Sequence, residues 1–195
     1  MEENQNIRDD KKQSIYKKYF VVILDFLKVI IIAAVIVLPI RYFLFQPFIV
    51  KGESMVPNLH SGDYLIIDEI SYRFSSPKRG DIVVLKYPLD TTQRFIKRVV
   101  GLPGETIDVK DGKITVLKGQ ENVVLNEEYL PNNLETEGNV NITLKDDEYF
   151  VLGDNRQFSY DSRRWGALPK EDLIGKAVFR VFPLSSMTLI LGQSY

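Results

Sequence analysis

Cysteine is absent from this sequence of 195 residues, and histidine occurs once, as His60. Without cysteine the chain has no disulfide, no thiolate nucleophile and no thiolate-ligated metal site. Cysteine usage therefore does not indicate whether the protein lies in an oxidising or a reducing compartment. A histidine-based zinc site is implausible, and a Ser-His-Asp triad would have to use His60. His60 lies in a turn-like stretch six residues after Ser54, so we do not expect it to be catalytic.

An excess of charge of either sign is also missing. The chain has 25 basic and 26 acidic residues and a net charge of -1, so no global field attracts nucleic acid and we expect no such partner. We also expect no metal and no cofactor. The length suits one well-buried domain of about 150 residues with an appendage.

The appendage is an apolar N-terminal segment. Its uncharged run, residues 29–40, has 12 residues and cannot by itself cross about 30 Å of hydrocarbon. A transmembrane anchor over residues 21–43 is long enough if Asp25 and Lys28, one helical turn apart, pair or snorkel. We therefore expect a bilayer as a partner.

Two alternatives to the anchor are weaker. A cleaved signal peptide needs small residues after its apolar core, whereas residues 38–43 are bulky. A buried helix of a soluble protein is apolar on one stripe, whereas residues 29–40 are apolar all round.

Basic residues set the expected orientation. Five of them precede the anchor: Arg8, Lys11, Lys12, Lys17 and Lys18. By the positive-inside rule we expect a cytoplasmic tail over residues 1–20, a single pass through the cell membrane and an extracytoplasmic domain over residues 44–195.

The remaining chain has the pattern of a mainly β protein. Short runs rich in β-branched and aromatic residues alternate with Gly, Pro, Asn and Asp, which favours coiled antiparallel sheets over a βαβ fold. The predicted strands are 47–50, 64–67, 81–87, 94–100, 105–109, 113–117, 148–152 and 177–182. A small insertion is expected around 106–147, with the polar residues 122–145 as a loop or a small insertion on the main sheet, and a turn near 169–173.

Ser54 is the candidate nucleophile. If residues 48–54 are extended, Phe48, Val50, Gly52 and Ser54 share one face. Gly52 then lets another backbone approach, which suits an extended peptide added as a strand, and Pro57 stiffens the following turn. The alternative is an ordinary strand exit in which Ser54 caps backbone groups.

Lys97 is the candidate base. Strand alternation places it between the apolar Phe95 and Val99, and burial disfavours an ammonium. At an ordinary pKa of about 10.4 only about 0.04% of the amine is neutral at pH 7, so a working base needs a pKa lowered by roughly 2 to 3. Arg98 cannot serve, because guanidinium does not deprotonate in proteins. The alternative for Lys97 is a sheet lysine whose amine reaches water.

Four stretches together resemble the ordered boxes of the bacterial type I signal peptidases. They are 52–57 (Gly-Glu-Ser-Met-Val-Pro), 79–84 (Arg-Gly-Asp-Ile-Val-Val), 95–105 (from Phe-Ile-Lys-Arg to Gly-Glu) and 153–163 (from Gly-Asp-Asn-Arg to Ser-Arg). The resemblance covers about residues 20–183 and is similar to the shorter enzymes typical of Gram-positive bacteria.

The resemblance implies a Ser-Lys dyad of Ser54 and Lys97 that removes signal peptides through an acyl-enzyme. Substrates would be secretory preproteins with small residues before the cleavage site. The oxyanion and substrate positions would be Gly52, Met55 and Pro57, with the Ser54 backbone N–H as an oxyanion donor. The supporting residues would be Arg98 paired with Asp154, Ser159 orienting the lysine, and Asp161 with Arg163.

Several positions depart from the common family pattern: Asn58, Glu105, Phe158 and Gly52. Gly52 stands where some members carry a serine, so no side chain there can donate to the oxyanion.

Other interpretations stay open. Asp154 and Asn155 also fit a generic Asx turn, and Asp161 with Arg163 a surface pair. A calcium site at Asp154, Asn155 and Asp161 is disfavoured by Arg156. The whole chain could instead be a Ser-Lys self-cleaving regulator or a non-catalytic, membrane-tethered β binding protein.

Overall fold

The computed structural model describes residues 20, 22–37, 45–119, 121–131 and 134–192. The chain divides into two compact units, residues 1–43 and 44–195, and each is described by itself. In the first unit, residues 22–37 are helical and the amine of Lys28 lies 3.1 Å from the carboxylate of Asp25, the predicted pairing. Residues 21 and 38–43 of the predicted anchor lie outside the described residues. Within the part of the chain that is described, no helix is long and apolar enough to cross a membrane.

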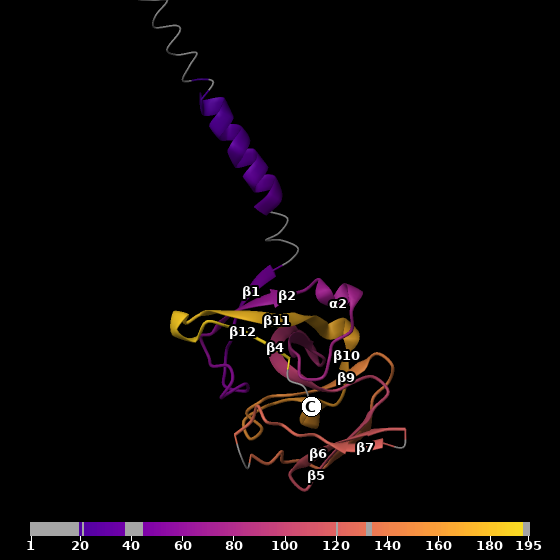
Figure 1. The fold of residues 1–195 in the computed structure, drawn as a ribbon. Helices are drawn as coiled ribbons and strands as arrows, with labels where there is room; N and C mark the ends of the chain where they lie inside the picture. Colours follow the sequence, from indigo (N-terminus) through magenta and orange to yellow (C-terminus); the bar gives the residue numbers. More distant parts are fainter. Residues whose placement is uncertain (1–19, 21, 38–44, 120, 132–133, 193–195) are drawn as a thin grey trace, which may run out of the picture. The chain divides into compact units, whose positions relative to one another are not determined.

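The second unit is mainly β, with every strand pair antiparallel, as predicted (Figure 1). Its larger sheet has the order β1 (Phe45–Ile49), β2 (Tyr64–Asp68), β11 (Leu173–Phe182), β3 (Ile82–Tyr87), β4 (Asp90–Gly101), β9 (Glu148–Leu152) and β10 (Leu168–Pro169), with β12 (Thr188–Leu189) paired to β11. The smaller sheet has the order β7 (Glu121–Val124), β6 (Lys113–Lys118), β5 (Thr106–Lys110) and β8 (Val140–Thr143). Four short helical turns complete the unit: α2 (Ser71–Phe74), α3 (Ser162–Trp165), η1 (Lys170–Asp172) and η2 (Leu184–Ser186).

All eight predicted strands are present, and the turn expected near residue 170 is η1. The prediction of a loop over residues 122–145 was wrong at both of its ends, where β7 and β8 add edge strands to the smaller sheet. β7 is exposed throughout and therefore lacks the alternating burial that marks a strand. β8 does alternate, with Val140 and Ile142 half-buried, but it has only four residues and lies in a polar stretch.

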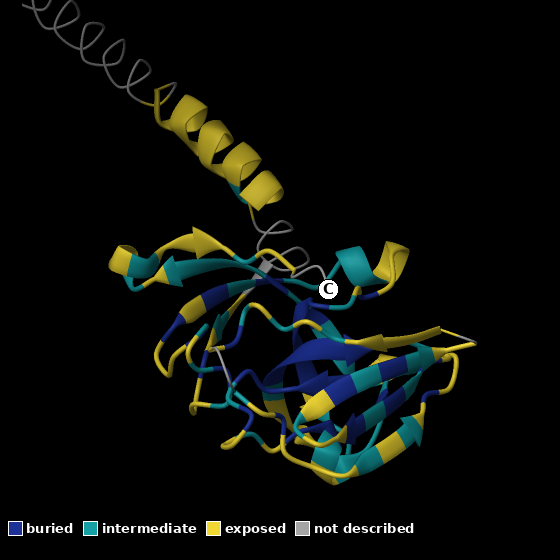
Figure 2. Cartoon of the chain, turned by 60° about the horizontal axis from the view of Figure 1, so that its bottom comes forward, coloured by how far each residue is buried: buried dark blue, intermediate teal, exposed yellow. Residues whose placement is uncertain are grey.

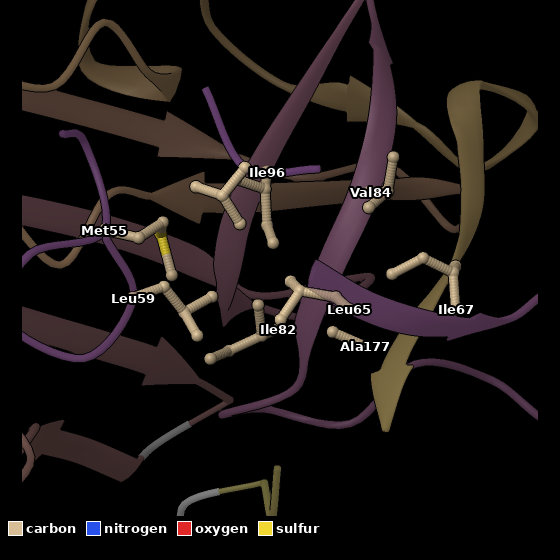
Figure 3. Close-up of a cluster of buried hydrophobic side chains, with 9 residues drawn as sticks. Met55, Leu59, Leu65, Ile67, Ile82, Val84, Ile96 and Ala177 are labelled. Atoms are coloured by element: carbon tan, nitrogen blue, oxygen red, sulfur yellow. The ribbon is translucent and has the colours of Figure 1, made fainter. Parts of the chain in front are cut away.

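The core consists of three apolar clusters, which appear as the dark strand centres of Figure 2. β3 is buried on both faces: Ile82 and Val84 pack into the first cluster, Val83 and Leu85 into the third. This follows from the alternation of side chains along a strand. In the first cluster Met55 and Leu59, from the chain after β1, pack on side chains of β2, β3, β4 and β11 (Figure 3).

The end of β1 determines where Ser54 lies. The condition that residues 48–54 are extended, from which a shared face of Gly52 and Ser54 was inferred, is not met, because β1 ends at Ile49 and Ser54 lies in a turn. Gly52 has a φ of +83°, a conformation that bends the chain and that glycine adopts without steric cost. The insertion of Met55 into the core then fixes the neighbouring Ser54.

The burial of the first cluster should carry much of the stability of this unit. We predict that Leu65→Ala, which truncates a side chain of β2 with 0% exposure, lowers the free energy of unfolding by about 2 to 5 kcal/mol. Leu189→Ala on β12, where the side chain is 65% exposed, is the matched control and should change it by less than about 0.5 kcal/mol. Urea unfolding of the purified full-length protein measures both, and equal effects would contradict this description of the core.

Candidate active site

The side chains of Ser54 and Lys97 meet although 43 positions separate them in the sequence. Lys97 Nζ lies 2.8 Å from Ser54 Oγ and also donates to the carbonyl of Ile96 at 2.9 Å. Lys97 is in the middle of β4, opposite Val83 of β3, whereas Ser54 is on the turn after β1. The antiparallel order of the sheet therefore brings the two candidate residues to hydrogen-bond distance.

Lys97 is buried, with 4% of its surface exposed. Phe95 and Val99 pack in one cluster on the same side of β4, as alternation predicted, and the amine lies 5.4 Å from the centre of the Phe95 ring. Desolvation lowers the pKa of Lys97 to about 8, although the charges of Asp161 and Asp154 act in the opposite direction. A lysine with this pKa is partly neutral near pH 7 to 8, and a neutral amine can accept a proton.

Arg98 and Asp154 form a buried ion pair next to the lysine. Arg98 Nε and Nη2 donate to the two carboxylate oxygens of Asp154 at 2.8 and 2.6 Å, and Nη1 donates to the carbonyl of Gly80. The register of β4 and β9 sets Arg98 beside Leu152, two residues before Asp154. The Asn58 amide donates to Asp154 as well, at 2.8 Å. The pair expected from the family is thus made here, and both members are desolvated.

Asp161 and Arg163 organise the loop 153–163. Asp161 caps α3 and accepts from Arg163 Nε at 2.9 Å and from the backbone N–H of Gly153 at 3.1 Å. Arg163 also donates to the carbonyls of Arg156 and Glu137. Because both side chains are buried, the pair is not a surface ion pair but a cross-link within the loop.

The same loop holds the backbone of the candidate nucleophile. The N–H of Asn155 donates to the carbonyl of Ser54 at 3.0 Å, and its side-chain amide to the carbonyl of Glu53 at 3.1 Å. A Cβ at Gly153 would lie only 2.4 Å from the Ser54 carbonyl oxygen. Glycine at this position therefore permits the close approach of the two segments.

The remaining predicted residues have different surroundings. Ser159 Oγ is buried and has no hydrogen-bond partner among the described residues, so its predicted bond to Lys97 is not formed. Met55 is 1% exposed and belongs to the core under the site. Pro57 and His60 are exposed. The backbone N–H of His60 donates to the carboxylate of Asp63, and its carbonyl accepts from the backbone N–H of Asp63.

A cleft of about 700 Å³ opens over Ser54 and Lys97. Its lining comes from β1 and the following turn, from the first half of β4 and from the loop 153–163. Gly52 is part of this lining, as are the aromatic side chains of Phe158 and Tyr160.

Sequence reasoning missed several residues around the site. Asn58 was noted only as a departure from the family pattern, and Asn155 as a turn former and a disfavoured calcium ligand, yet both form hydrogen bonds to residues of the candidate site. Glu127 and Tyr129 were missed altogether, because they lie in a polar stretch with no periodicity. Arg156 contacts both Glu127 and Tyr129 and lies two residues after the predicted site residue Asp154. Its position was the signal that could have pointed to these two residues.

The carboxylates that were weighed as calcium ligands are engaged otherwise. Asp154 binds Arg98 and Asp161 binds Arg163, which neutralises both charges. Among the described residues no group of three or more acidic or histidine side chains could hold a metal ion.

A serine hydroxyl beside a buried amine, on an antiparallel β scaffold, is typical of hydrolases that use lysine as the base. Comparison with known proteins narrows this class. The family model described as "Signal peptidase, peptidase S26" matches residues 23–182, and the chain therefore belongs to the signal peptidase family of serine endopeptidases.

Two relatives illustrate the match. The probable signal peptidase I-1 of Synechocystis sp. is 40% identical to this chain, over 80% of this chain and 81% of the relative. The signal peptidase I P of Bacillus subtilis subsp. natto is also 40% identical, over 83% of this chain and 90% of the relative. The crystal structure of a signal peptidase I from Enterococcus faecalis V583 is 30% identical, with a TM-score of 0.45 over 53% of this chain and 98% of that one.

The buried amine should reduce stability. With a pKa of about 8 in the folded chain and about 10.4 in the unfolded one, Lys97 costs about 3 kcal/mol below pH 8, and this cost disappears as pH rises to about 10.4. We predict that Lys97→Met is up to about 3 kcal/mol more stable than wild type at pH 7 and equally stable near pH 10.5. Urea unfolding at both pH values measures the difference.

Lys86→Met, at an exposed position of β3, is the control and should show no such pH dependence. A Lys97→Met variant less stable than wild type at pH 7 would contradict a lowered amine pKa.

Proposed function

We propose that this chain is a membrane-anchored serine endopeptidase that removes signal peptides from secretory preproteins, with Ser54 as nucleophile and Lys97 as general base. The observation that carries the proposal is the 2.8 Å separation of Ser54 Oγ and the desolvated Lys97 Nζ, in a chain of the signal peptidase family. His60, the one histidine of the sequence, is exposed, and its hydrogen bonds to Asp63 involve its backbone.

The proposed reaction begins with neutral Lys97. The amine takes the proton of the Ser54 hydroxyl, and the Ser54 oxygen attacks the scissile carbonyl. Lys97 then returns this proton to the leaving amine of the mature protein, which leaves the signal peptide esterified to Ser54. The neutral amine next activates a water, whose attack releases the signal peptide and regenerates the serine. The Ser54 backbone N–H is the proposed oxyanion donor, because Gly52 offers no side chain.

The open edge of β4 is the proposed binding surface for the substrate. β4 pairs with β3 along its length but with β9 only from Arg98 onwards, so no described strand covers the other edge over residues 94–97. These residues line the cleft opposite the turn at Gly52. An extended peptide can add its backbone there as a strand, which presents its scissile carbonyl to Ser54. We propose preproteins with small residues before the cleavage site as the substrates.

We further propose that residues 21–43 anchor the chain by a single pass in the cell membrane, with residues 1–20 in the cytoplasm. The extracytoplasmic catalytic domain would then be residues 44–195, with an insertion around 106–147. Support comes from the apolar and exposed side chains of residues 29–33 and 35–37, from the pairing of Asp25 with Lys28, and from the basic residues before the segment.

The remaining proposed roles follow the site geometry. Arg98 with Asp154, and Asp161 with Arg163, would hold the loop that supports Ser54. Ser159, whose buried hydroxyl has no hydrogen-bond partner among the described residues, would orient the Lys97 amine. Met55 would support the substrate pocket from below, since it packs in one cluster with Ile96 and Phe48, which line the cleft, and Pro57 would stiffen the turn.

Cleavage of a preprotein by the purified full-length protein tests the dyad. We expect Ser54→Ala and Lys97→Met each to lower kcat/KM by at least about 10³-fold, because one removes the nucleophile and the other its base. The matched controls Ser75→Ala and Lys86→Met change exposed residues and should keep full activity. Full activity in both dyad variants would refute the assignment.

The same preparation separates the alternatives. A self-cleaving regulator would cut its own chain and ignore preproteins. A binding protein would retain peptide affinity but resist labelling by a serine-directed acylating inhibitor.

The lowered pKa of Lys97 predicts an acidic limb in the rate of acylation. Only the neutral amine accepts the serine proton, so the rate constant should rise about tenfold per pH unit below pH 7 and level off above the pKa of about 8. Pre-steady-state cleavage between pH 5 and 9.5 measures this limb. His60→Ala should preserve its midpoint, and a rate that stays constant down to pH 5 would show that Lys97 is not the base.

A further inference from the structure

Arg156 joins the loop after β9 to the chain between β7 and β8. Its guanidinium is fully buried and donates to both carboxylate oxygens of Glu127, at 2.6 and 2.5 Å. The hydroxyl of Tyr129 accepts from Arg156 at 3.0 Å and donates to Glu127 at 2.5 Å, and the hydroxyl of Thr136 also accepts from Arg156. The three partners belong to the described part of residues 125–139, which lies outside both sheets.

On its other side Arg156 contacts the loop that holds Ser54. Its Nε donates to the carbonyl of Gly153 at 3.1 Å, and its backbone carbonyl accepts from Arg163 at 2.7 Å. The adjacent residue is Asn155, which bonds to the carbonyl of Ser54. One buried side chain therefore separates Glu127 from the segment that holds the candidate nucleophile.

Tyr129 provides a second connection. Its ring lies 4.0 Å from the guanidinium carbon of Arg98, and its backbone carbonyl accepts from the Asn58 amide at 3.1 Å. The same amide donates to Asp154. The stretch 125–139 thus contacts the loop through Arg156 and the Arg98–Asp154 pair through Tyr129.

Stability alone does not account for this arrangement. A buried ion pair commonly contributes no more to folding than well-packed apolar side chains of similar volume would. What it provides is direction, since two short charge-assisted hydrogen bonds fix the plane of a guanidinium. The Arg156 plane in turn fixes the carbonyl of Gly153, the residue against which the Ser54 carbonyl packs.

We propose that Glu127 and Tyr129 are positioning residues that act through Arg156 to hold the loop 153–156, and with it Ser54, at the distance from Lys97 that acylation requires. The inference rests on the proposed function. It assigns to the stretch between β7 and β8 a role in the rate of the chemical step, not in substrate binding.

Glu127→Gln tests this role, because it keeps the shape of the side chain and removes the charge that fixes Arg156. We expect kcat for preprotein cleavage to fall about 10- to 100-fold, with KM within about twofold of wild type, since a displacement of about 1 Å at a reacting group has effects of this size. Glu128→Gln is the matched control: it makes the same charge change one residue away, at an exposed side chain that accepts only from Asn126 in the described structure. It should leave both constants unchanged.

Both variants are assayed at a temperature where circular dichroism shows them fully folded. A folded Glu127→Gln enzyme with wild-type kcat would overturn the proposal, as would a rise in KM alone. If Glu127→Gln does not fold, Tyr129→Phe replaces it: this variant removes one hydroxyl and keeps the ring over Arg98, and its kcat should fall about threefold or more at unchanged KM. An unchanged kcat in Tyr129→Phe would then overturn the proposal.

Failure of this inference is distinguishable from failure of the proposed function. If wild type cleaves preprotein and Ser54→Ala does not, the dyad stands whatever Glu127→Gln does. If wild type does not cleave, the function itself is wrong.

Discussion

The desolvation of the Lys97 amine is the interaction on which the rest of the site depends. In water this amine would be charged at neutral pH, whereas burial lowers its pKa to about 8, which corresponds to a cost of about 3 kcal/mol for the charged form. Burial follows from its place in the middle of β4, where Phe95 and Val99 pack on its side of the strand and β3 pairs alongside. The sheet therefore excludes water from the amine, and the pH dependence of the proposed reaction follows from this packing.

The charged side chains around the amine form ion pairs. Arg98 is neutralised by Asp154, Arg163 by Asp161 and Arg156 by Glu127, and each pair is largely buried. An unpaired cation at any of these positions would lie in the same apolar region as Lys97. It would make the protonation of Lys97 still less favourable, or it would prevent the chain from folding. The pairs also link three segments that are distant in the sequence: β4, the loop after β9, and the stretch between β7 and β8.

The structural features that could be predicted from the sequence are those set by residues close together in the chain. Eight strands were predicted because their side chains alternate or are continuously apolar, and those signals are local. β7 was not, since an exposed four-residue edge strand carries almost no such signal, and the alternation of β8 extends over only four residues of a polar stretch. The error at Ser54 had another local cause. The alternation of side chains was applied as if the chain were extended through Gly52, but the positive φ of that glycine ends the extended conformation. Beyond Gly52 the alternation therefore does not predict which side chains share a face.

By itself the sequence determined the class of fold, the absence of a cysteine nucleophile, the restriction of any histidine base to His60, and the identity of the serine and the lysine as candidates. These depend on composition, on periodicity and on motifs that are contiguous in the chain. Only the tertiary structure decided that Ser54 and Lys97 lie 2.8 Å apart, that Asn155 holds the serine backbone, and that Glu127 and Tyr129 lie behind the loop. Those contacts join residues about 30 to 100 positions apart, and no local pattern encodes a distance that strand order and register alone set.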